Sequence, residues 1–396
     1  MSREMLDKLL KQANELEDSP AKVEILEECV RTADVIGDSR ESFGIRLQLI
    51  STACISGQDE RAFIAISWCL HDDDKSHYNN QELLQNYGYI IDISPEFYKL
   101  SLSQIRQLQE DFRIRLESSN FSLREYYRIR ADYANKLGFT DERKRFLVLW
   151  RAAKGVGLFE KEVLQCLSIT DAVIDGDYSN ALSLARPVLT GKMTDWGFRE
   201  HTYAELINVS LQHGDLQRAE SFYALGYPLA VKQTIFLTSI RWYLAFLTRI
   251  ADIARGQRLV ERHIPVILQR ISPLQRMKFL SVTASFFERV HELAPQSRKV
   301  RFPVTLSVHS IEGRYDPFEL TSWFRERAGD LAREFDNRNG NAHVSWELAK
   351  ERALSLGLPI PEYPNEPPPA DEFPGQHDAP KKPSGTRPKW KLEKLP

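Results

Sequence analysis

Apolar residues recur at steps of three and four along most of the first 298 residues, which is the spacing that one face of an α-helix requires. The stretch LDKLLKQANELED keeps these steps from Leu6 to Leu16. Few stretches before residue 300 alternate with the two-residue period of a strand. The pattern therefore predicts an almost entirely helical segment over residues 1–298.

Capping residues mark where individual helices begin and end. Ser19 is suited to accept the free N–H groups of a helix that has Pro20 at its first position. Gly37 is suited to end that helix, because glycine tolerates the left-handed conformation just beyond a helix end. Asp38 can then cap the next helix, SRESFGIRLQLISTACIS. The sequence therefore predicts short helices joined by tight turns.

Glycine interrupts the helical runs at a nearly constant spacing. Five glycines stand between two helical stretches: Gly57, Gly138, Gly176, Gly214 and Gly256. The last four are 38, 38 and 42 residues apart, and the 81 residues after Gly57 leave room for a further unit that turns within residues 93–108. A repeating unit of about 34–47 residues made of two helices is typical of an α-solenoid.

The motif Gly-Asp-x-x-x-Ala occurs at two of these turns, as Gly176–Ala181 and as Gly214–Ala219. The glycine ends the first helix, and the aspartate can accept the exposed N–H groups of the second. The alanine lies one turn into the second helix, where a small side chain lets the two helices approach closely. Ala62 has the same offset from Gly57. The motif therefore predicts closely packed helix pairs.

The unit at residues 200–233 resembles the tetratricopeptide repeat (TPR) family. The positions that carry the resemblance are Tyr203, Leu206, Gly214, Asp215, Ala219, Tyr223 and Pro228. Earlier units depart from the family pattern, with Ala185 in place of an aromatic residue and Arg143 in place of the small alanine. The resemblance implies an all-α, right-handed superhelical solenoid of TPR-like helix pairs over residues 1–298. HEAT-like or irregular helical repeats are the alternative, particularly after residue 235.

The pattern changes after residue 294. We expect residues 299–360 to form a linker followed by a C-terminal helix pair that caps the solenoid. The alternating residues 304–308 leave open whether 302–308 forms a strand. Residues 361–396 are rich in proline and charge, and they become basic after Pro380, so we expect a disordered tail.

Composition is that of an ordinary soluble protein, but charge varies along the chain. The 396 residues are 42% apolar and 27% charged, with a formal net charge of −2. Residues 1–100 hold 19 acidic and 10 basic side chains, whereas residues 240–301 hold 4 and 12. No stretch approaches the ~18–20 apolar residues of a membrane span. The four cysteines lie in apolar helical runs without a Cys-x-x-Cys pair, so we expect a cytoplasmic protein.

Few residues are arranged in a way that supports catalysis. We find no phosphate-binding, nucleophile-elbow or zinc-protease motif in the sequence. Three polar stretches are candidates: HDDDKSH at 71–77 for a metal, His343 with Glu347 for an acid–base pair, and FDNRNGN at 335–341 for a ligand. A solvated helix end, an exposed pair on one helix and a tight turn explain them more simply. We therefore expect no enzyme activity, no metal and no cofactor.

The resemblance implies a binding surface instead. In TPR proteins the first helix of each pair lines a concave groove that holds peptide segments. Carried to this chain, the groove face comprises Glu125, Arg128, Asp132, Asn135, Lys136, His201, Asn208 and Gln212. Basic and amide side chains could hold an acidic segment or a C-terminal carboxylate of a protein partner. We therefore expect an adaptor or regulatory scaffold; some bacterial members of the family sense signalling peptides.

Nucleic acid is the alternative partner. Basic residues interleave with aromatic residues in the basic segment, an arrangement that suits phosphate contacts and base stacking. The candidates are Arg241, Arg249, Arg258, Arg262, Arg270, Arg276 and Lys278, together with the basic tail. Aromatic residues at helical spacing are also typical of a core, so this alternative ranks second.

Overall fold

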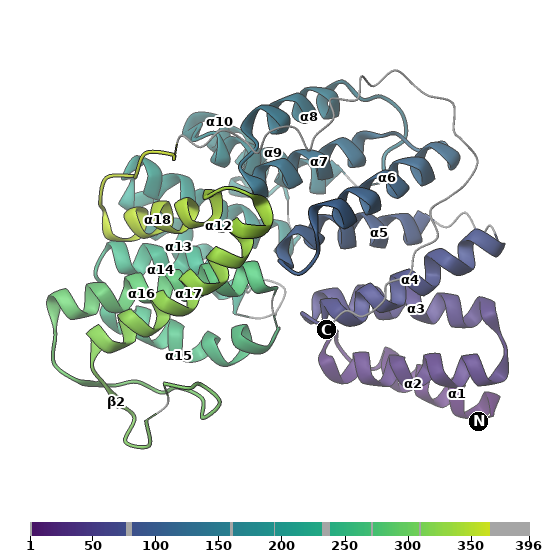
Figure 1. Cartoon of the computed structure of the whole chain (residues 1–396), viewed down its shortest axis with the longest axis horizontal. Coiled ribbons are helices and arrows are strands. Elements are labelled where there is room, and N and C mark those ends of the chain that lie inside the picture. The colour runs from purple at the N-terminus through teal and green to yellow at the C-terminus, as the bar shows by residue number, and fades with distance from the viewer. Residues whose placement is uncertain are drawn as a thin grey trace. The chain divides into compact units, whose positions relative to one another are not determined.

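The computed structural model describes residues 2–76, 81–158, 161–193, 195–231, 238–270, 272–308 and 310–364. Across these residues the chain is all-α, with eighteen α-helices, one 3₁₀ helix and one pair of two-residue strands (Figure 1). The expected all-α class is therefore confirmed. The described residues form two compact units, the first within 1–158 and 336–342, the second within 159–335 and 343–364.

The first unit is built from helices in antiparallel succession. They are α1 (Arg3–Asn14), α2 (Pro20–Ile36), α3 (Ser39–Ile55), α4 (Asp59–Ser76), α5 (Gln81–Ile93), the 3₁₀ helix η1 (Ser94–Glu96), α6 (Leu102–Ser118), α7 (Arg124–Leu137) and α8 (Thr140–Ala152).

The second unit contains the remaining helices and the strand pair. They are α9 (Lys161–Ile174), α10 (Tyr178–Leu184), α11 (Arg186–Leu189), α12 (Trp196–His213), α13 (Leu216–Ala230), α14 (Ile240–Arg249), α15 (Ile253–Arg270), α16 (Pro273–Leu293), β1 (Arg298–Lys299), β2 (Arg314–Tyr315), α17 (Pro317–Asn339) and α18 (His343–Leu356). The last residues of α17 are grouped with the first unit.

The predicted turns between paired helices are present at four of the five glycines. Gly57, Gly138, Gly176 and Gly214 all have positive φ values, between 68° and 83°. Asp177 accepts the backbone N–H of Asn180 and Asp215 accepts that of Arg218, both at 3.1 Å. The predicted close-packing alanines Ala62, Ala181 and Ala219 are completely buried. The Gly-Asp-x-x-x-Ala motif therefore builds helix pairs as expected.

The prediction of a turn at Gly256 is wrong. The chain turns at Ala251, which has φ 58°, and Asp252 caps α15 by accepting the N–H of Arg255 at 2.9 Å. Gly256 lies inside α15, where a Cβ atom would overlap the ring of Phe286 on α16. The glycine is there to let two helices approach, and not to end one.

A helix pair fills the long interval between Gly57 and Gly138, as predicted. Helix α5 ends at Ile93, η1 follows, and α6 begins in a capping box in which Ser101 and Gln104 satisfy each other's backbone N–H groups. This turn lies within the predicted residues 93–108 and needs no glycine.

Successive first helices contact one another in each unit. In the first unit α3 contacts α5 and α5 contacts α7; in the second α9 contacts α12, α12 contacts α14, and α14 contacts α16. The second helices α4, α6, α10, α13 and α15 each contact the first helix of their own pair and that of the next. We call α3, α5 and α7, and separately α9, α12, α14 and α16, the first-helix rows of the two units.

The linker forms a small antiparallel pairing instead of a longer strand. Arg298 lies opposite Tyr315 and Lys299 opposite Arg314, while the described residues 302–308 form loops and turns. Residues 302–308 therefore do not form a strand. Most of the predicted disordered tail, residues 365–396, lies outside the described residues.

Candidate protein-binding surfaces

Three carboxylates lie around Lys136 at the first-helix row of the first unit. Lys136 on α7 donates from Nζ to the carbonyl oxygen of Asp92 at 2.6 Å and forms ion pairs with Asp92 and Glu96. Burial lowers the pKa of Lys136, but Asp92, Glu96 and Asp132 raise it above its ordinary value. Tyr89 on α5 is 41% exposed. The charges of this cluster are therefore paired within the unit, Lys136 with Asp92 and Glu96 and Arg128 with Asp132.

Two predicted groove residues, Glu125 and Arg128, are almost completely buried, at 1% and 3% exposure. Arg128 pairs with Asp132 at 2.8 Å and lies over the ring of Trp150. Asn135 is half-buried on the same helix. The exposed part of the predicted groove on α7 is therefore limited to Asp132, Asn135 and Lys136.

The reason for the burial of Glu125 is that part of the chain itself lies on this row. Glu125 Oε1 accepts the N–H of Leu158 at 2.8 Å, and Gln85 on α5 donates to the carbonyl of the same residue at 2.7 Å. The N–H of Ser122 donates to the carbonyl of Val156 at 2.9 Å. Leu158 is 2% exposed. Side chains of two first helices thus bind an extended backbone segment on both its N–H and its C=O side.

Glycine makes this binding mode possible at Gly157. A Cβ atom at that position would lie 2.6 Å from Glu125 Oε1, so a larger residue would push the carboxylate away from the N–H it accepts.

In the second unit, the predicted groove residues of α12 connect it to α9. His201 Nε2 and Thr170 Oγ1 share a hydrogen bond of 2.9 Å. Gln212 Nε2 donates to Asn208 Oδ1 at 3.1 Å and to the carbonyl of Val173 at 3.4 Å. All three predicted residues are half-buried or exposed on one side of α12, and they hold successive first helices together.

Helix α18 lies on the first-helix row of the second unit, where it contacts α12, α14 and α16. Arg241 Nε on α14 and Glu351 Oε1 on α18 form an ion pair of 3.6 Å. Burial raises the pKa of Glu347, but Lys278 and other cations lower it below its ordinary value. The guanidinium of Arg249 lies against Gly357, just beyond the end of α18. Three of the predicted nucleic-acid residues therefore lie near glutamates or the C-terminal end of a helix of the same chain.

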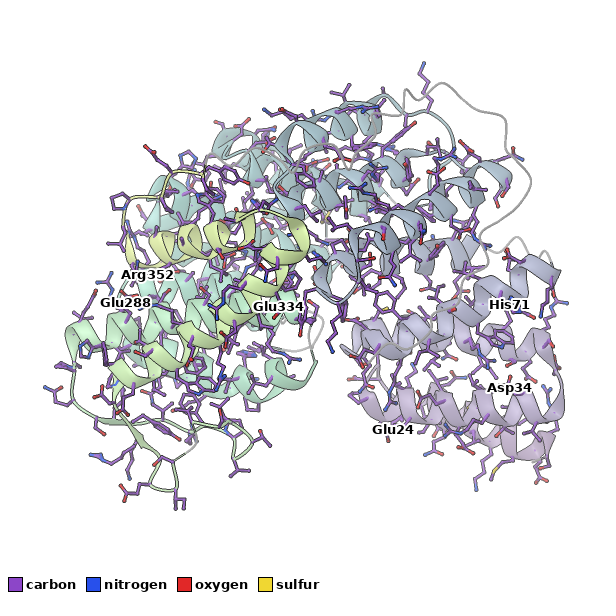
Figure 2. All side chains as sticks on the ribbon, in the orientation of Figure 1. Glu24, Asp34, His71, Glu288, Glu334 and Arg352 are labelled. Atoms are coloured by element: carbon purple, nitrogen blue, oxygen red, sulfur yellow. The ribbon has the colours of Figure 1, made fainter. Side chains whose placement is uncertain are left out.

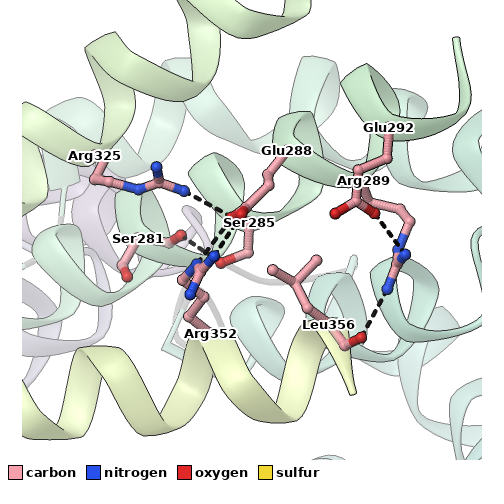
Figure 3. A network of polar contacts seen from close by, with 8 residues as sticks. All are labelled: Ser281, Ser285, Glu288, Arg289, Glu292, Arg325, Arg352 and Leu356. Atoms are coloured by element: carbon pink, nitrogen blue, oxygen red, sulfur yellow. Dashed lines mark hydrogen bonds and ion pairs between the residues drawn. The ribbon is translucent and has the colours of Figure 1, made fainter. Parts of the chain in front are cut away.

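A second set of polar contacts joins α16 to α17 and α18. Glu288 Oε2 accepts from Arg325 at 2.7 Å and from Arg352 at 2.9 Å, and Arg289 Nη2 donates to the carbonyl of Leu356 at 2.7 Å (Figure 3). Glu288 and Arg352 are labelled on their helices in Figure 2. The guanidinium of Arg352 is first among the groups that counteract burial and hold the pKa of Glu288 below its ordinary value. Arg289 thus binds the C-terminal end of α18 through the carbonyl of Leu356.

The other basic candidates are spread over the second unit. Arg258 and Arg262 are exposed on α15, and Arg276 is half-buried on α16. The side chain of Arg270 lies outside the described residues. The six basic residues whose side chains the structure describes therefore do not form one continuous exposed stripe.

The polar turn at 336–341 binds backbone within the first unit. Arg338 Nη1 donates to the carbonyl of Phe97 at 3.1 Å, and Asn341 Nδ2 donates to that of Leu137 at 2.9 Å. Burial lowers the pKa of Arg338 to about 10. These side chains attach the turn to the ends of two helical segments.

Sequence reasoning missed the residues that bind the chain's own segments. Gln85 and Arg289 carried no motif, because a helical period shows which face a residue occupies but not what covers that face. The one available signal was the i, i+4 spacing of Glu347 and Glu351 on the last helix, opposite in charge to residues 240–301.

Within the described residues no group of three or more histidine, cysteine, aspartate or glutamate side chains could hold a metal ion. In HDDDKSH, Asp73 and Asp74 pair with Arg115, and His77 lies outside the described residues. Of the helices that the structure describes, none is long and apolar enough to cross a membrane. No protein-family model and no curated protein matches this chain.

Proposed function

We propose that this chain is a protein-binding scaffold, built as a right-handed TPR-like solenoid, that holds segments of partner proteins on its first-helix rows and performs no catalysis. The contacts between successive first helices, and of each second helix with the first helices on either side, support the TPR-like form.

One observation carries the proposal: in both units a first-helix row already holds a segment of the chain itself. Gln85 and Glu125 bind the backbone of Leu158, and Arg289 binds the last carbonyl of α18. Side chains that bind backbone groups in this way bind a segment largely independently of its sequence, which is how repeat proteins hold peptides. The four cysteines are free thiols, three of them buried, which supports a reducing, cytoplasmic location.

The test compares the two faces of the first unit by photocrosslinking. A benzophenone amino acid replaces either Tyr89, on the first helix α5, or Val148, which is 63% exposed on the second helix α8. After irradiation in an extract of the source organism, we expect defined protein adducts from position 89 and few from position 148.

Equal crosslinking at both positions would contradict binding on the first-helix row. Adducts that disappear after nuclease treatment would favour the nucleic-acid alternative, for which the exposed Arg258 and Arg262 are then the residues to replace. A circular dichroism spectrum of each substituted chain verifies that its helices are intact.

A further inference from the structure

Helix α18 covers the first-helix row of the second unit at α12, α14 and α16. Residues Trp242 to Thr248 of α14 are all buried, although a surface helix normally buries only one stripe. Helices α12, α13, α15, α16 and α18 together surround α14. By covering the row, α18 buries the side of α14 that the other four helices do not contact.

The face that α18 turns toward the row follows helical spacing. Val344, Leu348, Glu351 and Ser355 are buried and recur at steps of four, three and four. An amphipathic helix that inserts such a stripe into a groove is a common mode of protein recognition. The stripe is unusual because its third position is a glutamate with 2% exposure.

Charge on the two sides is complementary. The row contributes Arg241, Lys278 and Arg289, and α18 contributes Glu347, Glu351 and its terminal carbonyl group. Glu288 on the row in turn accepts from Arg352, so α18, which has two acidic and two basic side chains, pairs with the row in both directions. The last carbonyls of a helix have no partner within the helix, and that end carries a partial negative charge. The cations of the row therefore fit glutamates on the buried side of a helix and the C-terminal end of that helix.

The central ion pair is not optimised for stability. Arg241 Nε and Glu351 Oε2 are buried and have no hydrogen-bond partner, although Arg241 and Glu351 lie within ion-pair distance. A buried pair with incomplete hydrogen bonding contributes little net stability, but it specifies which helix binds and in which register.

We propose that the row formed by α14 and α16 is a binding site for an amphipathic helix of a partner protein with glutamates on its buried side, and that α18 is the built-in occupant which that helix displaces. This inference rests on the proposed scaffold function. The partner helix carries apolar residues at two successive turns, a glutamate at the next, and ends about one turn later, as α18 does.

Because α18 is covalently attached to the chain, a partner helix must compete with a tethered segment for the row. Residues 340–342 alone separate α17 from α18. A short connection gives a tethered segment an effective concentration in the millimolar range, so a free helix competes poorly until α18 is loosened.

The experiment measures binding of a fluorescent peptide of residues 343–364 to the full-length chain by anisotropy. Glu351→Lys places a lysine opposite Arg241 and loosens α18 without changing the row. We expect this chain to bind the peptide about tenfold or more tightly than the unsubstituted chain does. A peptide with Glu347→Lys and Glu351→Lys should not bind either chain.

Matched variants separate release of α18 from damage to the fold. Arg352→Glu also loosens α18, because it removes the contact with Glu288 (Figure 3), and should raise peptide affinity as well. Glu334→Lys makes the same charge change as Glu351→Lys, but on the exposed side of α17, and should leave affinity unchanged. Adding Arg241→Glu to Glu351→Lys should abolish binding.

The inference is overturned if the loosened chains keep their helical spectrum yet bind the peptide no better than the unsubstituted chain. Equal binding of the charge-reversed peptide would also overturn it. A loosened chain that becomes a dimer by light scattering would make a second copy, and not a partner, the occupant. None of these results decides the crosslinking test, which probes the first unit at Tyr89.

Discussion

At the scale of single residues, Glu200 on α12 is the most perturbed acid of the second unit. It is completely buried, and its carboxylate accepts hydrogen bonds from Tyr243 at 2.9 Å and Ser239 at 3.2 Å. Burial raises its pKa from 4.5 to about 8, against the lowering effect of those two hydroxyls. The folded chain therefore keeps a proton on Glu200 at neutral pH.

This proton makes stability depend on pH. Between pH 4.5 and about 8 the unfolded chain has lost the proton and the folded chain has kept it, so stability falls as pH rises through this window. Glu200→Gln should remove that slope and raise the free energy of unfolding at pH 8 by on the order of 4 kcal/mol. Urea unfolding at pH 5 and pH 8 measures how the free energy of unfolding depends on pH. The substitution Glu162→Gln, at an exposed glutamate, is the control. An unchanged slope would contradict a protonated Glu200.

Gly256 offers a second test at this scale. Alanine is about 1 kcal/mol better than glycine inside a helix, but the Cβ atom would overlap Phe286, and overpacking costs about 1–3 kcal/mol. We therefore expect Gly256→Ala to lower the melting temperature. Gly44, inside α3, has open space where its Cβ would lie, so Gly44→Ala should raise the melting temperature slightly. The same sign for both substitutions would show that the contact with Phe286 is not tight.

At the scale of helices and turns, the two copies of Gly-Asp-x-x-x-Ala differ in one contact. Both aspartates cap a helix, but Asp215 also accepts a hydrogen bond of 2.8 Å from Tyr178 of the preceding pair. Asp177→Ala should cost about 1 kcal/mol and Asp215→Ala about 2 kcal/mol, as measured by urea unfolding. Equal losses would mean that the Tyr178 bond adds nothing.

Helix pairs and their caps were predictable from the sequence because their signals are local. Gly176, Asp177 and Ala181 are within one turn of one another, so their spacing alone specifies the turn. Gly256 was misassigned because a glycine serves both to end a helix and to admit a neighbour, and only the second helix tells the two apart. The position of α18 on the first-helix row could not be predicted. It depends on contacts with residues about 100 positions away in the chain, such as Arg241.

At the scale of the whole molecule, contacts with α18 account for part of the uneven distribution of charge along the chain. The excess of basic residues in 240–301 includes Arg241, Arg249 and Lys278, which lie against α18, while the net charge of the chain stays at −2. Basic composition alone therefore did not distinguish a nucleic-acid surface from a surface that binds the glutamates of a helix.

The two units are also interleaved along the chain. Residues 336–342 belong to the first unit, where Arg338 and Asn341 donate to the carbonyls of Phe97 and Leu137. A ribosome makes these seven residues only after most of the second unit has left the exit tunnel. Domains usually fold in the order of their synthesis, but here the first unit can complete its hydrogen bonds only once the second has been almost entirely translated.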